Sequence, residues 1–194
     1  MREGLCHQCG VHRNICVCDV CQPISGAPVI WALQHPSEVA RAKGTLRIAR
    51  ACLPSLQVRV GETPEDFAEP AARAASAGMG LLFPTEGSQP LESSVLDPMM
   101  EWLVVDGTWR KASRIFHTNP WLQKLPRYHF EQPPESKYCI RRASRSDSLS
   151  TAEAITCLIG TLRPELDTST LENAMRALVD RQLAAMPPAA RSRY

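Results

Sequence analysis

The chain has 194 residues, a length that suits one domain with at most a small appendage. Hydrophobic residues make up 44% of it, enough for a buried core, but none of its apolar runs reaches the ~18 residues of a membrane-spanning helix. The net charge of +2 is too small to indicate a polyanionic partner. The 18 arginines against 4 lysines fit either a phosphate-binding surface or a compositional bias.

The first 27 residues form a cysteine-rich head. Five of the eight cysteines lie between residues 6 and 21, where a signal peptide would have its apolar segment, so we expect a cytoplasmic protein and a metal site rather than disulfides. Four thiolates complete a tetrahedral, structural zinc site, and so short a head would depend on the metal to fold. The predicted ligands are Cys6, Cys9, Cys16 and Cys18. Cys21 is the spare, although an exchange with Cys18 stays open, and an iron–sulfur cluster is the weaker alternative.

Beyond the head, predicted strands and helices alternate. The first half has predicted strands at 28–36, 56–61 and 80–84, helices at 37–54 and 64–78, and a loop at 86–98. The second half has predicted strands at 101–107, 125–134 and 136–143, and helices at 108–118, 150–162 and 169–186. This alternation predicts an α/β fold with a mostly parallel sheet flanked by helices. The expected units are the head (1–27), a main domain (28–186) and a frayed tail (187–194).

The segment WLVVDGTWRKASRIF, residues 102–116, brings polar groups to the end of an apolar strand. Ligands of parallel sheets bind beyond the carboxyl ends of strands, so the loops after His35, Phe83 and Asp106 are candidate walls of a site. On spacing alone, a simpler interpretation is favoured, in which Asp106 caps the following helix and Trp109 belongs to the core.

Other polar patterns also have two interpretations. Lys43, Arg47 and Arg50 have i, i+4, i+7 spacing and predict one basic helix face, which is either simply solvated or binds phosphate. Ser150 and Glu153 have the spacing of a capping box, which explains both without a ligand.

Several of these segments together resemble the DTW-domain family, the tRNA-uridine aminocarboxypropyltransferases. After the cysteine head, the matching motifs follow in order as QHPSEVARAKGTLRIA (34–49), LLFP (81–84), VVDGTWRKASRI (104–115), LP (125–126) and YCIRR…LSTAEA (138–154). The resemblance implies a SPOUT-like fold with a C-terminal knot that binds S-adenosylmethionine, although nothing in the periodicity indicates a knot.

The resemblance also implies a reaction. The 3-amino-3-carboxypropyl group of S-adenosylmethionine would pass to N3 of a tRNA uridine, with position 47 expected, and 5′-methylthioadenosine would be released. Because uracil N3 carries a proton, the reaction needs a base, and Asp106 is the predicted one. The expected state is a monomer or homodimer, with tRNA and S-adenosylmethionine as partners, one structural Zn²⁺ and no membrane. The alternatives are a SPOUT-type RNA methyltransferase and a non-catalytic zinc RNA-binding module.

The resemblance places the remaining site residues. The expected cofactor-binding residues are Leu82, Phe83, Pro84, Asp106, Gly107, Thr108, Leu125, Pro126, Tyr138, Ile140, Arg141 and Thr151. The expected RNA-binding residues are His35, Glu38, Lys43, Thr45, Arg47, Arg50, Arg110 and Arg114. Trp109 is left out, because the pattern does not show whether its indole packs or contacts a ligand.

Overall fold

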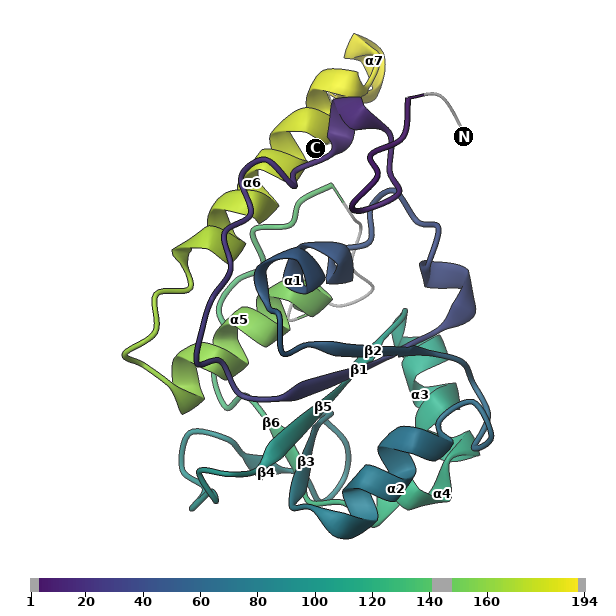
Figure 1. Cartoon of the computed structure of the whole chain (residues 1–194), viewed down its shortest axis with the longest axis vertical. Helices are drawn as coiled ribbons and strands as arrows, with labels where there is room; N and C mark the ends of the chain where they lie inside the picture. The colour runs from purple at the N-terminus through teal and green to yellow at the C-terminus, as the bar shows by residue number, and fades with distance from the viewer. Residues whose placement is uncertain (1–3, 141–147, 192–194) are drawn as a thin grey trace.

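The computed structural model describes residues 4–140 and 148–191, whose centre is one six-stranded sheet (Figure 1). The strands are β1 (Ile30–Gln34), β2 (Gln57–Val60), β3 (Met79–Leu82), β4 (Gln89–Pro90), β5 (Glu101–Asp106) and β6 (Arg127–His129). They are ordered β2-β1-β5-β3-β6-β4, and every neighbouring pair is parallel. The predicted α/β fold with a mostly parallel sheet is therefore confirmed.

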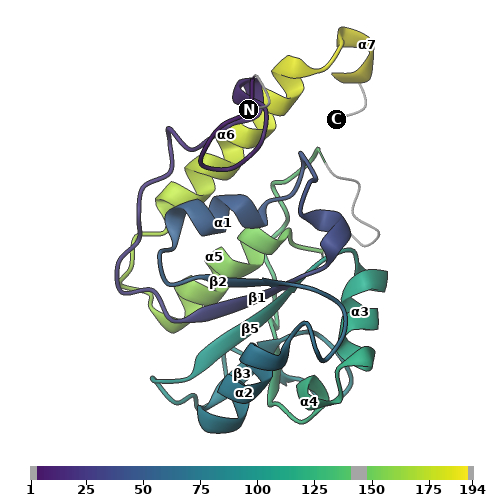
Figure 2. The same cartoon turned by 45° about the vertical axis from the view of Figure 1, so that its right-hand side comes forward.

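Helices cover both faces of this sheet (Figures 1 and 2). One face carries α1 (Leu46–Cys52), α5 (Thr151–Leu162) and α6 (Ser169–Ala185). The other face carries α2 (Ala68–Ser76), α3 (Trp109–Thr118) and α4 (Pro120–Gln123). Shorter elements are the 3-10 helices η1 (Arg13–Ile15) and η2 (Pro36–Glu38) and the helix α7 (Pro188–Arg191). No helix of the described residues is both long and apolar enough to cross a membrane.

The central strands are buried on both faces, as a covered parallel sheet requires. Ile30 and Ala32 of β1 belong to the core that α1, α5 and α6 share. Trp31 and Leu33 belong to the core that α3 and α4 share. Since side chains alternate along a strand, β1 supplies both cores with apolar groups while its carboxyl end is left for polar ones.

The helix predicted at 37–54 is wrong in its first half. Pro36–Glu38 forms η2, a turn follows, and α1 begins only at Leu46. The N-cap of η2 is His35, whose Nδ1 accepts a hydrogen bond from the backbone N–H of Ser37 at 3.1 Å. The residue that begins the predicted helix, Ser37, therefore gives its N–H to the residue two positions earlier.

The strand predicted at 136–143 is also wrong where the structure describes it. Residues 136–140 are irregular, and residues 141–147 lie outside the described part of the chain. The backbone N–H groups of Lys137 and Tyr138 donate to the carboxylate of Glu153 at 2.7 and 3.2 Å. A side chain on α5 therefore takes the donors that a strand would give to its neighbour.

Two smaller differences lie at the edges of the fold. The segment expected to be a loop at 86–98 contains β4, which pairs with β6 at the border of the sheet. Its proline, Pro90, is tolerated there because an edge strand needs no donor on its outer side. Within the tail that was expected to fray (187–194), Pro188–Arg191 forms the helix α7, and residues 192–194 lie outside the described part of the chain.

The head packs on the helices of one face of the sheet. Figures 1 and 2 both place it beside α6 and close to α1. Val17 and Ile24 belong to the core that includes α1, α5 and α6. The guanidinium of Arg181 on α6 donates two hydrogen bonds of 2.7 Å to the carboxylate of Asp19. The head is thus held by apolar contacts and by an ion pair.

Candidate functional site

Asp106 lies at the carboxyl end of β5, in the middle of the sheet, and is only 5% exposed. Its Oδ2 accepts a hydrogen bond of 2.8 Å from Nε2 of Gln34, the residue opposite it on β1. Its Oδ1 accepts one of 2.5 Å from the hydroxyl of Thr151. Three elements, β1, β5 and α5, therefore orient one buried carboxylate.

The same carboxylate does not cap α3. The N-cap of α3 is Thr108, whose side chain makes no capping hydrogen bond, and the Asp106 oxygens accept from Gln34 and Thr151 instead. The simpler interpretation of Asp106 as a capping residue is therefore wrong. Thr151 is the first residue of α5, so the N-terminus of that helix lies beside Asp106, where its dipole favours negative charge.

Gly107 makes the turn from β5 into α3 tight. A Cβ atom at this position would lie 3.2 Å from Cβ of Lys111 and 3.6 Å from Cβ of His35. A side chain here would require Lys111 on α3 to shift by a few tenths of an ångström, so glycine favours close packing of α3 beside Asp106.

The start of α5 is fixed by three polar contacts. Ser150 and Glu153 form the predicted capping box, each side chain receiving a hydrogen bond from the other's backbone N–H. The hydroxyl of Thr45, which is 4% exposed, accepts a hydrogen bond from the backbone N–H of Ala152 at 3.1 Å. These contacts fix the place from which Thr151 reaches Asp106.

Trp109 is the first residue of α3, three positions after Asp106. Its ring lies 6.1 Å from the ring of Phe83 at the end of β3, and Phe83 stacks on Phe116 at 5.0 Å. The indole Nε1 donates to the hydroxyl of Ser148 at 2.7 Å. The indole is thus half-buried, with one ring face on an apolar neighbour and its N–H satisfied.

His35 is held at both ring nitrogens. Because Nδ1 accepts from Ser37, the proton of the neutral ring is on Nε2, which donates to Oε1 of Glu62 at 2.8 Å. Oε2 of Glu62 also lies 3.2 Å from Nε of Arg114. The histidine therefore connects the end of β1 to the segment after β2 and to α3.

Glu38 also joins neighbouring elements of the fold. Its side chain is buried and forms an ion pair of 2.7 Å with Nζ of Lys111 on α3. Arg41 contacts its other oxygen at 3.3 Å. A buried carboxylate between two cations fixes η2 against α3, directly beside the turn at Gly107.

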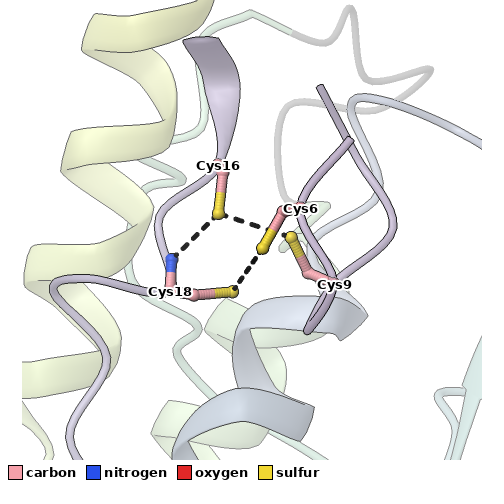
Figure 3. Close-up of side chains that lie close together, drawn as sticks. All are labelled: Cys6, Cys9, Cys16 and Cys18. Atoms are coloured by element: carbon pink, nitrogen blue, oxygen red, sulfur yellow. Dashed lines mark hydrogen bonds between the residues drawn. The ribbon is translucent and has the colours of Figure 1, made fainter. Parts of the chain in front are cut away.

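The head brings four thiol groups together (Figure 3). All four Sγ atoms of Cys6, Cys9, Cys16 and Cys18 lie within 4.8 Å of one another. The Cys6–Cys18 distance is 4.0 Å and the Cys9–Cys16 distance is 3.6 Å. A tetrahedral site with Zn–S bonds of about 2.3 Å separates its sulfur atoms by about 3.8 Å, so the four thiols could hold a metal ion.

Two further observations bear on this set of ligands. The backbone N–H of Cys9, together with the Cys16 thiol and the N–H of Gln8, lowers the pKa of Cys6 to about 6, which favours the thiolate that binds metal, whereas burial raises the pKa of Cys16 and of Cys18. Cys21 is not part of the group, because its Sγ donates to the carbonyl of Val17 at 3.2 Å. The described residues thus assign Cys18, and not Cys21, to the cluster.

Comparison with known proteins identifies the fold family. Residues 3–183 match the DTW domain. The chain belongs to the DTW-domain family. It is similar to tRNA-uridine aminocarboxypropyltransferase 2 of Mus musculus (27% identical) and of Macaca fascicularis (25% identical), in each case over 94% of this chain. The DTW chain covers 64% of the length of these relatives, and no solved structure matches it significantly.

The DTW domain brings part of the expected cofactor site together. Gly107 and Thr108 follow Asp106 directly, Thr151 binds it, and Leu82, Phe83 and Pro84 end the neighbouring strand β3. Leu125 and Pro126 precede β6, so they lie toward the amino ends of the strands, away from Asp106. Tyr138 and Ile140 are buried near Lys43, whose carbonyl accepts from the Tyr138 hydroxyl at 2.7 Å. Arg141 lies outside the described residues.

The single basic face expected from the sequence does not form, because α1 begins after Lys43. Nζ of Lys43 instead donates to the carbonyl of Ile140 at 2.9 Å. Arg47 lies in the first turn of α1, and its Nε and Nη2 are buried without a hydrogen-bond partner among the described residues. Burial lowers the pKa of this guanidinium, whereas negative charge on Cys9, Tyr138, Cys16 and Cys18 would raise it.

The other expected RNA-binding residues fall into two groups. Arg50, Arg110 and Arg114 are exposed on α1 and α3. His35, Glu38 and Thr45 are each less than 9% exposed and hold neighbouring elements together. Gln34 is a site residue that the sequence did not indicate. Only its pairing with Asp106 across β1 and β5 reveals it.

Proposed function

We propose that this DTW domain transfers the 3-amino-3-carboxypropyl group of S-adenosylmethionine to N3 of a tRNA uridine, with position 47 as the expected site. The observation that carries the proposal is the buried carboxylate of Asp106, oriented by Gln34 and Thr151 at the carboxyl end of the central strand. The relatives named tRNA-uridine aminocarboxypropyltransferase 2 support the same reaction class.

Asp106 would act as the base. The acceptor nitrogen of uridine carries a proton, and a carboxylate within hydrogen-bond reach can accept it as the new N–C bond forms. The amide of Gln34 and the hydroxyl of Thr151 fix the direction of the two oxygens, so the lone pairs do not have to be ordered during the reaction. The N-terminus of α5 favours the charged form that accepts the proton.

The donor would bind along the carboxyl ends of β3 and β5. When bound, S-adenosylmethionine supplies an activated carbon next to its sulfonium, and the by-product is 5′-methylthioadenosine. The half-buried indole of Trp109 offers an aromatic surface on which an adenine could stack, with the buried ring of Phe83 packed behind it. Tyr138 and Ile140 are the proposed residues of the opposite wall. Arg141, which lies outside the described residues, is proposed from the resemblance alone to bind the carboxylate of the amino acid group.

The proposal includes a SPOUT-related topology with a C-terminal knot. Two observations support this topology. The sheet is all-parallel, and after β6 the chain comes back to the central strand β5, where Thr151 binds Asp106. We further propose residues 28–186 as the catalytic unit and the head as a structural zinc module. Exposed arginines would position the tRNA backbone through phosphate contacts, which do not depend on the nucleotide sequence. These arginines are Arg50, Arg110 and Arg114.

The reaction is tested by mass spectrometry of tRNA nucleosides after incubation of the full chain with S-adenosylmethionine. We expect the mass of an aminocarboxypropyl group on one uridine and an equal amount of methylthioadenosine. Formation of S-adenosylhomocysteine with a methylated nucleoside would show a methyltransferase instead. Tight tRNA binding with no saturable binding of S-adenosylmethionine would show a non-catalytic RNA-binding module.

Replacement of the proposed base gives a sharper test. Asp106→Asn is close to isosteric and should lower the turnover number by about 10²–10⁴-fold, because an amide cannot accept the N3 proton. Calorimetry should show little change in S-adenosylmethionine affinity. Asp180→Asn, at an exposed position of α6, is the matched control and should keep wild-type turnover. Wild-type turnover in Asp106→Asn would exclude this residue as the base.

A further inference from the structure

Arg47 is an unusual cation in this fold. Its Nε and Nη2 atoms are buried and have no hydrogen-bond partner within residues 4–140 and 148–191. Nη1 makes one long contact, 3.4 Å, to the carbonyl of Arg41. A buried guanidinium with unused donors is costly unless a negative group accepts from it.

The surroundings of Arg47 indicate where that negative group lies. Three of the four clustered thiols, those of Cys9, Cys16 and Cys18, are among the groups whose negative charge would act on the guanidinium. Figure 3 shows the four thiols pointing toward one another, with the ribbon of α1 directly below them. The head and α1 are also neighbours in both whole-chain views (Figures 1 and 2).

A metal-loaded site would place negative charge close to Arg47. Four thiolates around a divalent cation carry a net charge of −2, and thiolate sulfur accepts hydrogen bonds from outer donors. Two other arginines lie close to the cluster, and one of them, Arg181, is already bound by the carboxylate of Asp19 and the carbonyl of Cys16. Arg13 is exposed and contacts the carbonyl of Leu5. Arg47 is the cation of this region whose donors the described residues leave unused.

We propose that Arg47 is the outer-shell charge partner of the metal–tetrathiolate centre. The loaded site supplies the negative charge that the buried guanidinium needs, and the guanidinium stabilises the thiolates in return. Because Arg47 belongs to α1, the same pairing couples metal binding to the packing of the head on the main domain. The inference concerns metal binding alone and does not depend on the proposed reaction.

Zinc affinity tests the pairing directly. We expect Arg47→Met, measured on the full chain by competition with a chromophoric zinc chelator, to bind Zn²⁺ about 10- to 100-fold more weakly than wild type. Arg50→Met removes the same charge from an exposed position on the same helix and should bind Zn²⁺ as wild type does. An affinity of Arg47→Met within threefold of wild type would overturn the proposal.

A stability measurement separates charge pairing from simple packing. Without metal, Arg47→Met should be as resistant to urea as wild type or more so, because the unpartnered buried charge is gone; with Zn²⁺ it should be less resistant. An equal loss in both forms would mean that the side chain only packs. Weaker tRNA binding with unchanged zinc affinity would make Arg47 a phosphate contact. Both results would overturn the proposal. If Arg47→Met does not fold, Arg47→Lys is measured in its place. This variant keeps the positive charge but lacks the guanidinium, so it should still bind Zn²⁺ measurably more weakly than wild type.

Discussion

At the scale of single residues, the site depends on how the two oxygens of Asp106 are shared. One is fixed by an amide from the neighbouring strand and the other by a hydroxyl from the first turn of α5. The hydroxyl of Thr151 comes from a residue 45 positions further along the chain, and the amide of Gln34 from one 72 positions earlier. The carboxylate is therefore set by the tertiary fold and not by its own loop.

The contribution of Thr151 can be isolated by paired substitutions. Thr151→Val keeps the shape but removes the donor to Oδ1, and we expect transfer to fall by roughly 10- to 100-fold because the carboxylate is no longer aligned. Thr151→Ser keeps the hydroxyl but lacks the methyl group, and it should have most of the wild-type transfer rate. If only the methyl group mattered, through packing, Thr151→Ser would be as slow as a variant that lacks it. Thr156→Val, one turn further along α5, is the control and should leave the rate unchanged. Equal rates for Thr151→Val and wild type would contradict the positioning role.

The sequence predicted part of this site for a physical reason. A carboxylate at the end of an apolar strand must lie at the ligand-facing edge of a parallel sheet, and the structure places Asp106 there. Thr151 came from resemblance and was not indicated by spacing. Gln34 was missed because a polar residue at a strand end gains its partner only from the register of two strands, which local sequence does not encode.

At the scale of elements, the start of β5 is anchored by Glu101, which is 6% exposed. Its carboxylate accepts a hydrogen bond of 2.8 Å from the indole of Trp31 on β1 and one of 2.9 Å from Nε of Arg73 on α2. The Arg73 guanidinium, with help from the indole, holds the pKa of the Glu101 carboxyl below its usual range even though burial opposes this. One side chain thus joins α2, β1 and β5.

This anchor predicts a pH dependence of stability. The pKa of Glu101 is lower in the folded than in the unfolded chain, so its contribution is complete above the ordinary glutamate pKa of about 4.3 and is lost as the pH falls through the folded value. Glu101→Gln should cost roughly 1–3 kcal/mol of unfolding free energy at pH 7, and less as the pH falls below about 4. Urea unfolding between pH 3 and 7 measures both effects. A constant difference between the two proteins over this range would contradict the assignment.

The elements that the sequence predicted well are those whose signals are local. The capping box at Ser150 and Glu153 marked the start of α5 correctly, because both partners lie within one turn. The lost strand came from donors claimed at longer range, because Glu153 also accepts from Lys137 and Tyr138. The short helix in the segment 37–54 has a local origin, because His35 caps η2 by accepting from Ser37 and a turn separates η2 from α1. Periodicity alone could not indicate either contact.

At the scale of the whole molecule, the head and the sheet domain share one apolar core. Val17 and Ile24 pack with residues of α1, α5 and α6. The head is therefore packed on the sheet domain and is not a separate unit with its own core. Any disorder of the cysteine cluster should expose the outer faces of α1 and α6 and lower the stability of the entire fold.

Metal removal should accordingly lower the melting temperature of the full chain. A ligand at a hundredfold excess over its dissociation constant adds about 2.7 kcal/mol, so Zn²⁺ at micromolar concentration should raise the melting temperature by several degrees. Cys6→Ser should abolish this metal-dependent shift, because it removes one of the four clustered thiols. Cys21→Ser is the matched control, since its thiol lies outside the cluster, and it should keep the shift. Loss of the shift in Cys21→Ser alone would reassign the fourth ligand.

The ion pair between Asp19 and Arg181 joins residues 162 positions apart, and this separation has a consequence during synthesis. At 5–20 residues per second, a ribosome adds Arg181 roughly 8–32 s after Asp19. The four cysteines follow one another closely, so under the proposed role of the head as a metal module an ion could bind long before α6 exists. The cysteine cluster is then the earliest part of the protein to be completed, and the helix beside it is among the last.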